Sequence, residues 1–167
     1  MKIPSWDIII IVCFVVGIVY GFVLRRERTL AALASVYLSL LVTKTWGQTV
    51  VDFFHGDRVV FNQVWIKADT SPAAINIVLF LVLFFLLIGF TSFASSKTKI
   101  SGLGVLLQSF FTVALLVSST ISFLSDDQKA QLFETSKFAA LVWQYHNLWI
   151  LLPVLVLIFM GIRYGEN

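Results

Sequence analysis

The sequence is poor in charge, cysteine and histidine, and each shortage argues against a class of protein. Charged residues make up 13% of the 167 residues, whereas an ordinary soluble domain carries about 25%. Cys13 is the only cysteine, so the chain has no intramolecular disulfide and no cysteine-rich zinc motif. The two histidines, His55 and His146, do not complete a convincing metal site with that single cysteine. We therefore expect no disulfide scaffold and no metal centre, and we interpret Cys13 as a small core residue.

Enzymatic motifs are also missing from the sequence. Gly102 and Gly104 are followed by Leu107 where a dinucleotide-binding fingerprint requires glycine, and the chain lacks a phosphate-binding Gly-Lys-Ser/Thr loop and a Gly-x-Ser-x-Gly turn. The net charge of +3 is carried mostly by tight clusters beside apolar stretches, which suits anionic lipid headgroups better than a nucleic acid. We expect no enzymatic activity, no cofactor and no nucleic-acid partner.

Long apolar stretches are what the chain has in excess, because hydrophobic residues make up 59% of it. Five stretches are apolar enough to leave water: residues 8–24, 30–51, 73–93, 103–124 and 138–162. A helix of about 20 predominantly apolar residues crosses a bilayer and satisfies its own backbone hydrogen bonds. The sequence therefore predicts an all-α fold, a polytopic membrane protein with about five transmembrane helices in one bundle. Residues 1–167 then form a single integral membrane domain.

Clusters of basic residues in short connections predict the orientation of these helices. One cluster lies between the first two stretches and another between the third and fourth, and we take both as topology determinants on the cytoplasmic side. Their members are Arg25, Arg26, Arg28, Lys97 and Lys99. The totals of Lys and Arg on the two sides tie, so only local density decides. We expect the amino terminus outside and the carboxyl terminus in the cytoplasm.

Small residues at helical spacing predict where these helices pack against each other. Gly17 and Gly21 form a Gly-x-x-x-Gly pair, and two further rows of small residues repeat every four residues in the second and fourth stretches. Such residues let helix backbones approach closely in a membrane. The two rows, which we expect to pack against each other or against the first helix, are Ala31, Ser35 and Ser39, and Ala114, Ser118 and Ser122.

Several residues suit the ends and bends of helices. Asp7 carries a carboxylate suited to the positive amino end of the first helix, and Ser71 and Pro72 suit the start of the third. Pro153 predicts a kink near Trp149 in the last stretch.

Two further segments lie outside the five stretches. Residues 55–71 fit either a short hairpin or a helix on the membrane surface. Residues 129–142 mix apolar and charged residues at roughly helical spacing, which favours an interfacial lead-in to the last stretch.

Polar residues at membrane depth are the candidates for function, because each is costly there without a partner or water. Lys44 either extends its stem to the boundary or faces inward with Gln48, lining a polar path or pairing with Asp52.

Three more intramembrane polar residues are candidates. Gln108 is more typical of a hydrogen bond between helices than of a ligand-binding group. Gln144 and His146 lie among aromatic residues typical of a membrane boundary, although a protonatable His146 at the mouth of a cavity is the alternative.

Two parts of the sequence carry a resemblance to a known family. Residues 5–35 combine an aspartate before the first stretch, a glycine near its end and an arginine-rich turn, and residues 72–124 contain a lysine-bearing turn with Ser-Gly between two apolar stretches. Both resemble the colicin V production protein family over about residues 5 to 124. Asp7, Gly21 and Arg25 match the family pattern. The chain departs from it after the turn, where Leu103 and its neighbours replace an Asp-Arg pair and further glycines, and in adding a fifth stretch.

The resemblance implies a protein of the bacterial inner membrane that is associated with toxin production or export and with envelope maintenance, and with no established reaction. From this and from the small-residue rows, we expect a structural or accessory subunit that acts by helix packing. The expected partners are the lipid bilayer and a second copy of the chain or a larger membrane complex. The alternative is a small transporter or channel subunit, with a polar path near Lys44, Gln108 and His146.

Overall fold

The described part of the chain is helical throughout. A computed structural model describes residues 6–23, 25–55, 71–90 and 102–164. In those ranges the helices, listed in chain order, are α1 (Trp6–Val23), α2 (Arg25–His55), α3 (Pro72–Phe90), α4 (Gly102–Ser122), α5 (Asp126–Thr135), α6 (Lys137–Gln144) and α7 (His146–Tyr164). The predicted all-α class is confirmed for these residues. The segment predicted as a hairpin or surface helix, 55–71, lies almost wholly outside them.

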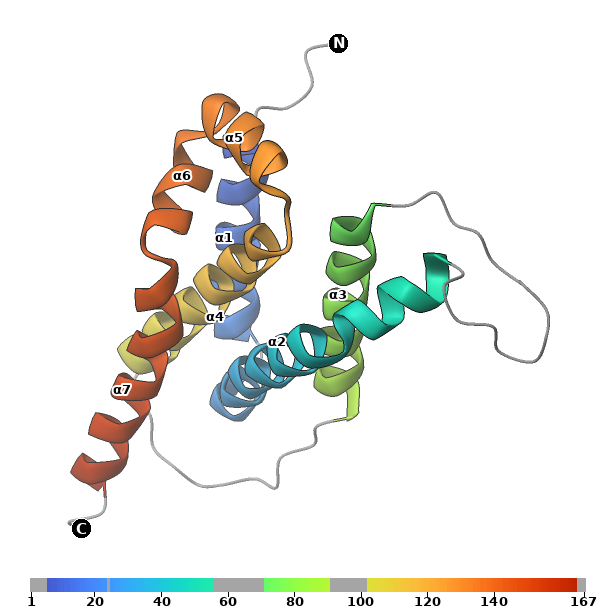
Figure 1. Cartoon of the computed structure of the whole chain (residues 1–167). Helices are drawn as coiled ribbons and strands as arrows, with labels where there is room; N and C mark the ends of the chain where they lie inside the picture. Colours follow the sequence, from blue (N-terminus) through green and yellow to red (C-terminus); the bar gives the residue numbers. More distant parts are fainter. Residues whose placement is uncertain (1–5, 24, 56–70, 91–101, 165–167) are drawn as a thin grey trace.

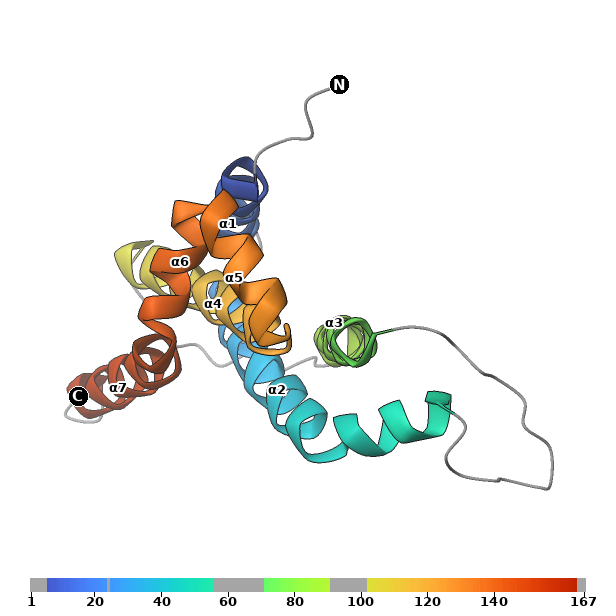
Figure 2. The same ribbon diagram turned by 45° about the horizontal axis from the view of Figure 1, so that its top comes forward.

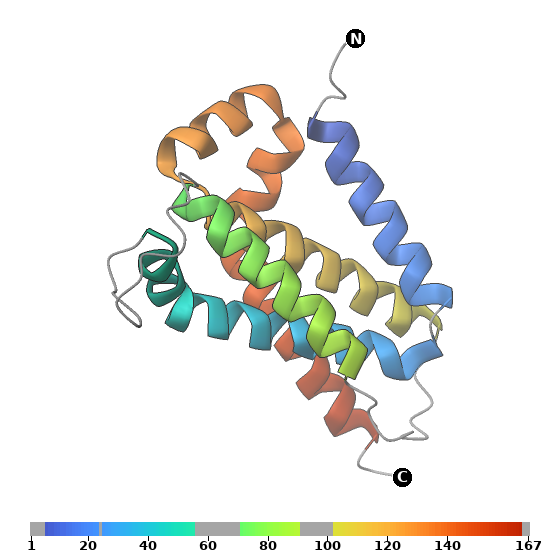
Figure 3. The same cartoon turned by 90° about the vertical axis from the view of Figure 1, so that its right-hand side faces the viewer.

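Helix α4 lies at the centre of the arrangement. It packs against α1, α2, α6 and α7, and α3 and α7 lie on opposite sides of it (Figures 1 and 2). The burial of the helices agrees, because 61% of the apolar stretch of α4 is buried against 17% of that of α3. Figure 3 shows α1 and α3 flanking α4 from the side. Helix α4 is therefore much more deeply buried than α3.

Three helices are long and apolar enough to cross a membrane: α2 over Thr29–Phe54, α3, and α4 over Gly104–Ser122. The α6–α7 pair would make a fourth if it forms one bent span. The described apolar stretch of α1, Trp6–Gly21, is shorter. The described residues therefore support three or four spans, and the predicted count of five is not established by them.

The prediction that the arginine-rich connection between the first two stretches forms a turn is wrong. Helix α2 begins at Arg25, so the segment expected to form the turn is helical. Arg and Glu have good helix propensity, and the sequence between Arg25 and Leu30 contains neither Gly nor Pro. The side chains of Arg25, Arg26 and Arg28 lie outside the described part, as do Lys97 and Lys99.

The last predicted stretch is broken in a place that the sequence did not indicate. Helices α6 and α7 meet at 57° around Tyr145, whereas Pro153 lies buried within α7. The expected kink near Trp149 is therefore wrong in position. At the break, the indole Nε1 of Trp149 donates to the carbonyl of Val142 at 2.9 Å. This side-chain bond satisfies an acceptor that a continuous helix would have bonded with its backbone.

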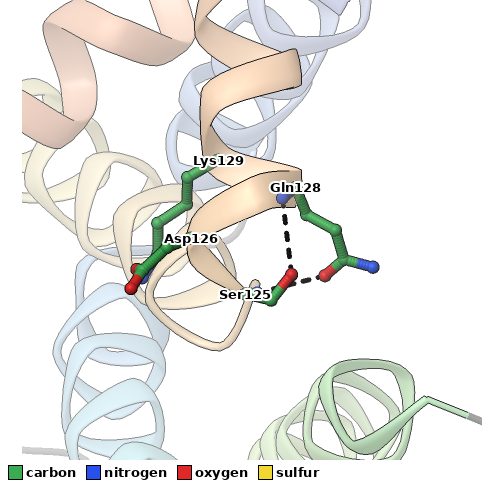
Figure 4. A network of polar contacts seen from close by, with 4 residues as sticks. All are labelled: Ser125, Asp126, Gln128 and Lys129. Atoms are coloured by element: carbon green, nitrogen blue, oxygen red, sulfur yellow. Dashed lines mark hydrogen bonds and ion pairs between the residues drawn. The ribbon is translucent and has the colours of Figure 1, made fainter.

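Short polar motifs set the ends of the other helices. Ser71 accepts a hydrogen bond from the Ala74 amide at 3.3 Å, so it caps α3 as predicted. Helix α5 begins with a capping box in which Ser125 and Gln128 bond to each other's backbone amides (Figure 4). Ser136 ends α5 and caps α6. The predicted lead-in over 129–142 is thus two helices rather than one.

The surface of the described residues is unusually apolar. Thirty large hydrophobic side chains are exposed, with long rows on the outer faces of α1, α3 and α7. Cys13 is also exposed on α1, so its interpretation as a core residue is wrong. Ten polar residues, mostly Ser and Thr, are buried. Soluble monomers rarely expose contiguous apolar patches of this extent, whereas lipid is a suitable neighbour for them.

Candidate functional site

The buried polar residues concentrate on α2 and α4, which pack against each other. We call this set the polar seam. On α2 it comprises Ser35, Ser39 and Thr43, spaced one turn apart, and on α4 it comprises Gln108, Ser109, Thr112, Ser118 and Ser119. All are at most 7% exposed. The seam holds eight of the ten polar residues that are buried in the described ranges.

Three of the eight residues of the seam are satisfied within their own helix. The hydroxyls of Ser109 and Thr112 each donate to the carbonyl four residues earlier, at 2.8 Å, and Ser118 donates to the carbonyl three residues earlier at 3.2 Å. Such back-bonds let hydroxyl side chains lie in an apolar interior without a partner on another helix. These residues therefore act as small, satisfied packing residues.

Four other residues of the seam each carry a side-chain atom with no hydrogen-bond partner among the described residues. The atoms concerned are Ser39 Oγ, Thr43 Oγ1, Gln108 Nε2 and Ser119 Oγ, and three further such atoms lie elsewhere: Thr29 Oγ1, Asn76 Oδ1 and His146 Nδ1. An unpaired buried polar group costs about 1–3 kcal/mol. An interior that keeps several of them can offer hydrogen bonds to a polar guest.

The Gly-x-x-x-Gly pair of α1 lies directly against α4. A Cβ on Gly21 would stand 1.8 Å from Ser109 Oγ, and one on Gly17 would stand 2.1 Å from Val113 Cγ2. Only glycine allows this separation of the two helix backbones. Gly17 and Gly21 thus take part in packing within the chain.

The small-residue rows are also inside the chain. Ala31, Ser35 and Ser39 of α2 are buried, as are Ala114 and Ser118 of α4, while Ser122 is partly buried and donates to the Ser119 carbonyl at 2.6 Å. Because the rows are already covered, they are unavailable to a partner in this arrangement.

Lys44 is exposed on α2 rather than in the seam. Gln48, one turn later, is also exposed, and its amide donates to Asp52 Oδ1 at 2.8 Å. The structure thus places the Gln48–Asp52 pair on the outer side of α2. The inward-facing alternative for Lys44 is wrong for this arrangement.

Gln144 and His146 fall on either side of the break between α6 and α7. Gln144 is exposed, whereas the partly buried ring of His146 stacks on Trp143 with a centroid separation of 4.9 Å. The ammonium of Lys129 lies 4.9 Å from the centroid of the Trp143 ring. The same ammonium lies 3.5 Å from Asp126 Oδ1. Lys44 and Lys129 both interact electrostatically with His146. The break therefore gathers positive charge around an imidazole.

Asp7 joins the first helix to the corner between α5 and α6. Its Oδ1 accepts from Ser136 Oγ at 2.5 Å and from the Phe138 amide at 3.2 Å. Ser136 Oγ in turn accepts from the Ala139 amide at 3.0 Å. We call this arrangement the Asp7 cross-cap. The carboxylate thus serves the amino end of α6 as well as lying in the first turn of α1.

Two close contacts between helices involve residues that the sequence did not single out. A Cβ on Gly47 of α2 would stand 2.5 Å from Asn76 Oδ1 of α3. The hydroxyl of Tyr37 donates to the carbonyl of Ile150 at 2.5 Å and joins α2 to α7. A glycine within a helix costs about 1 kcal/mol relative to alanine, and that cost was the available signal for Gly47. No comparable signal marked Tyr37.

Within the described ranges, no group of three or more His, Cys, Asp or Glu side chains could hold a metal ion. No protein-family model matches the chain, and comparisons with curated proteins and with solved structures find no match. The resemblance to the colicin V production protein family therefore stays a prediction.

Proposed function

We propose that the chain is a multi-pass membrane protein that acts as a structural or accessory subunit through helix packing. The observation that supports this proposal is the inverted polarity of the fold, with apolar side chains outside and Ser, Thr and Gln inside. Lipid accepts the outer faces at no cost, and small polar residues allow close packing within. The five-span count, in which α1 and the bent α6–α7 pair also cross the bilayer, belongs to this proposal.

The surface offered to a partner is bulky rather than small. The small-residue rows are covered inside the chain, whereas Val78, Val82, Phe85 and Phe90 are exposed on α3, which is the least buried of the three candidate spans. A second copy or a larger membrane complex would pack on this outer face of α3. The family resemblance adds the bacterial inner membrane and toxin export or envelope maintenance as the setting.

Membrane insertion and sidedness are tested together. Carbonate extraction should leave the chain in the membrane pellet, because its helices have no other place to bury their outer faces. In a Cys13→Ser background, the cysteine of Glu27→Cys should react only with a thiol reagent that crosses the membrane. The cysteine of Asp127→Cys should react with a thiol reagent that stays outside the cell. Release of the chain by carbonate would refute insertion, and the reverse labelling pattern would refute the orientation.

The partner surface is tested by purification in mild detergent. Phe85→Ala should reduce copurification with the partner and leave the free energy of unfolding unchanged within about 0.5 kcal/mol, since the side chain is 66% exposed. Val15→Ala, on the exposed face of α1, is the matched control. If the unmodified chain, Phe85→Ala and Val15→Ala all recover the same amount of partner, the outer face of α3 is excluded as the partner surface.

A second candidate function is a small transporter or channel subunit. Its support is the set of unpartnered buried polar atoms, with Gln108 in the seam and His146 at the helix break. Because such groups are costly in a membrane, they are typical of substrate or ion pathways. In proteoliposomes, Gln108→Leu should then lower the flux of the transported solute, whereas the exposed Gln144→Leu should not. If vesicles that contain the unmodified chain take up solute no faster than empty vesicles, the accessory role is favoured.

A further inference from the structure

A groove runs between α1, α4 and α5 at the end of the molecule where α1 begins. Its volume is about 550 Å³, within the range of about 300–1,000 Å³ that is typical of small-molecule sites. Helix α1 lines it with Trp6, Ile9, Ile10 and Cys13, a spacing that presents one helical face. Leu116, Val117 and Ile121 of α4 and Leu81 of α3 complete its apolar wall.

Polar side chains line the groove mainly from α5, since the one polar lining residue of α4, Thr120, donates its hydroxyl to the Leu116 carbonyl at 2.9 Å. Gln128, Gln131 and Thr135 lie on the same face of α5 and line the groove beside Leu132. The Asp7 cross-cap ties the carboxyl end of α5 to α1, so the polar wall is held in place over the apolar one. A molecule that fills the groove therefore needs an apolar tail and a hydrogen-bonding head.

Charge decides which head fits. Asp127 and Glu134 are exposed and seven residues apart, on one flank of α5 next to the groove face. Lys129, on the other flank, lies 3.5 Å from Asp126. Two carboxylates with no partner among the described residues therefore flank the α5 wall of the groove, although they are not part of its lining. They favour a headgroup that carries an ammonium over one with a net negative charge.

We propose that this groove binds the acyl chain of a membrane lipid whose headgroup carries an ammonium, as in phosphatidylethanolamine. This inference rests on the membrane insertion proposed above, because the lipid must be available beside the groove. The acyl chain lies along α1 and α4, and the headgroup meets Gln131 and the acidic flank of α5. No covalent step is involved.

The native cysteine provides the assay, since Cys13 lines the groove. In detergent micelles, phosphatidylethanolamine should slow alkylation of Cys13 by N-ethylmaleimide about tenfold at 90% occupancy, because only the unoccupied fraction reacts. Phosphatidylglycerol at the same mole fraction should slow it less than about twofold. The control is Val15→Cys in a Cys13→Ser background, on the exposed side of α1. Its rate should respond little, and equally, to the two lipids.

A charge reversal tests the headgroup. The double variant Asp127→Lys and Glu134→Lys should lose the preference for phosphatidylethanolamine and gain one for phosphatidylglycerol, each rate of alkylation being compared with that of the same variant without lipid. Equal protection by both lipids at Cys13 overturns the headgroup assignment. If added lipid slows alkylation of Cys13 and of the Val15→Cys control equally, the groove is not the binding site. The same conclusion follows if alkylation of Cys13 slows as the protein concentration rises in the absence of lipid. Carbonate extraction of the same proteins reports insertion separately, so failure of the groove and failure of insertion are distinguishable.

Discussion

The Asp7 cross-cap makes the sharpest prediction about stability. Asp7 is partly buried, and one of its carboxylate oxygens accepts two hydrogen bonds, from the cap residue Ser136 and from the Phe138 amide in the first turn of α6. A hydrogen bond to a charged group contributes about 1.5–3 kcal/mol, and exposure lowers that figure. We therefore expect Asp7→Ala to lower the free energy of unfolding by about 2 kcal/mol for both bonds together. Asp7→Asn keeps an acceptor without the charge and should cost about half as much.

The measurement is denaturation in mixed micelles of dodecyl maltoside and sodium dodecyl sulfate, followed by circular dichroism. Glu134→Gln, an exposed carboxylate at the end of α5, is the control and should change the free energy by less than about 0.5 kcal/mol. Hydrogen exchange should locate the effect, because the amides of Phe138 and Ala139 are the donors that lose their acceptor or its support.

A double-mutant cycle separates this bond from general damage to the helix ends. Ser136→Ala removes both the cap of α6 and the donor to Asp7. If the two side chains act together, the effects of Asp7→Ala and Ser136→Ala should fall short of additivity by about 0.5–3 kcal/mol. Strict additivity, or equal losses for Asp7→Ala and Glu134→Gln, would refute the cross-cap.

Two further predictions concern the packing of the helices. Gly21→Ala should destabilise the chain by about 1–3 kcal/mol in the same assay, because its Cβ would overlap a side chain of α4. Gly89→Ala meets nothing within 4 Å and should be neutral or stabilising by up to about 1 kcal/mol; similar losses for both would contradict the close approach. Tyr37→Phe should cost about 0.6 kcal/mol, the average for a hydrogen bond between membrane helices. The exposed Tyr20→Phe is its control, and an unchanged midpoint for Tyr37→Phe would remove the hydroxyl as a link between α2 and α7.

Local sequence predicted those parts of the fold that depend on local chemistry. The apolar runs predicted the positions of α2, α3 and α4, because a helix that satisfies its own backbone needs only length and composition. Ser71 and Pro72 predicted the start of α3 for the same reason, since capping acts within one turn.

Contacts between distant residues were beyond a single sequence. Asp7 meets Ser136 across 129 positions and Tyr37 meets Ile150 across 113, and no periodicity relates the members of either pair. The break at Tyr145 is spanned by a hydrogen bond from the Trp149 indole to the Val142 carbonyl. The sequence predicted a kink from Pro153, because the effect of proline on a helix backbone is known from the residue type alone. The hydrogen bond of Trp149 at the break has no such signal in the sequence.

Burial was the least predictable property, for a reason specific to lipid. In water an apolar residue such as Cys13 is usually buried. In this chain the outer face of α1 is as apolar as the inner one, so hydrophobicity does not distinguish them. Small size was the more useful signal, because Gly17 and Gly21 mark the face of α1 that lies on α4.

The division between inner and outer faces allows the two proposed functions to be separated by mutation. Side chains of the seam, such as Gln108, contribute to the interior, so their replacement reports on a polar path and on stability. Exposed side chains such as Phe85 contribute almost nothing to the interior, so their replacement reports on partners alone. A variant that keeps its free energy of unfolding but loses function must therefore have lost a surface, and the position of the substitution then identifies it. Loss of function only at the outer face of α3 would mean association, and loss only at Gln108 with stability retained would mean transport.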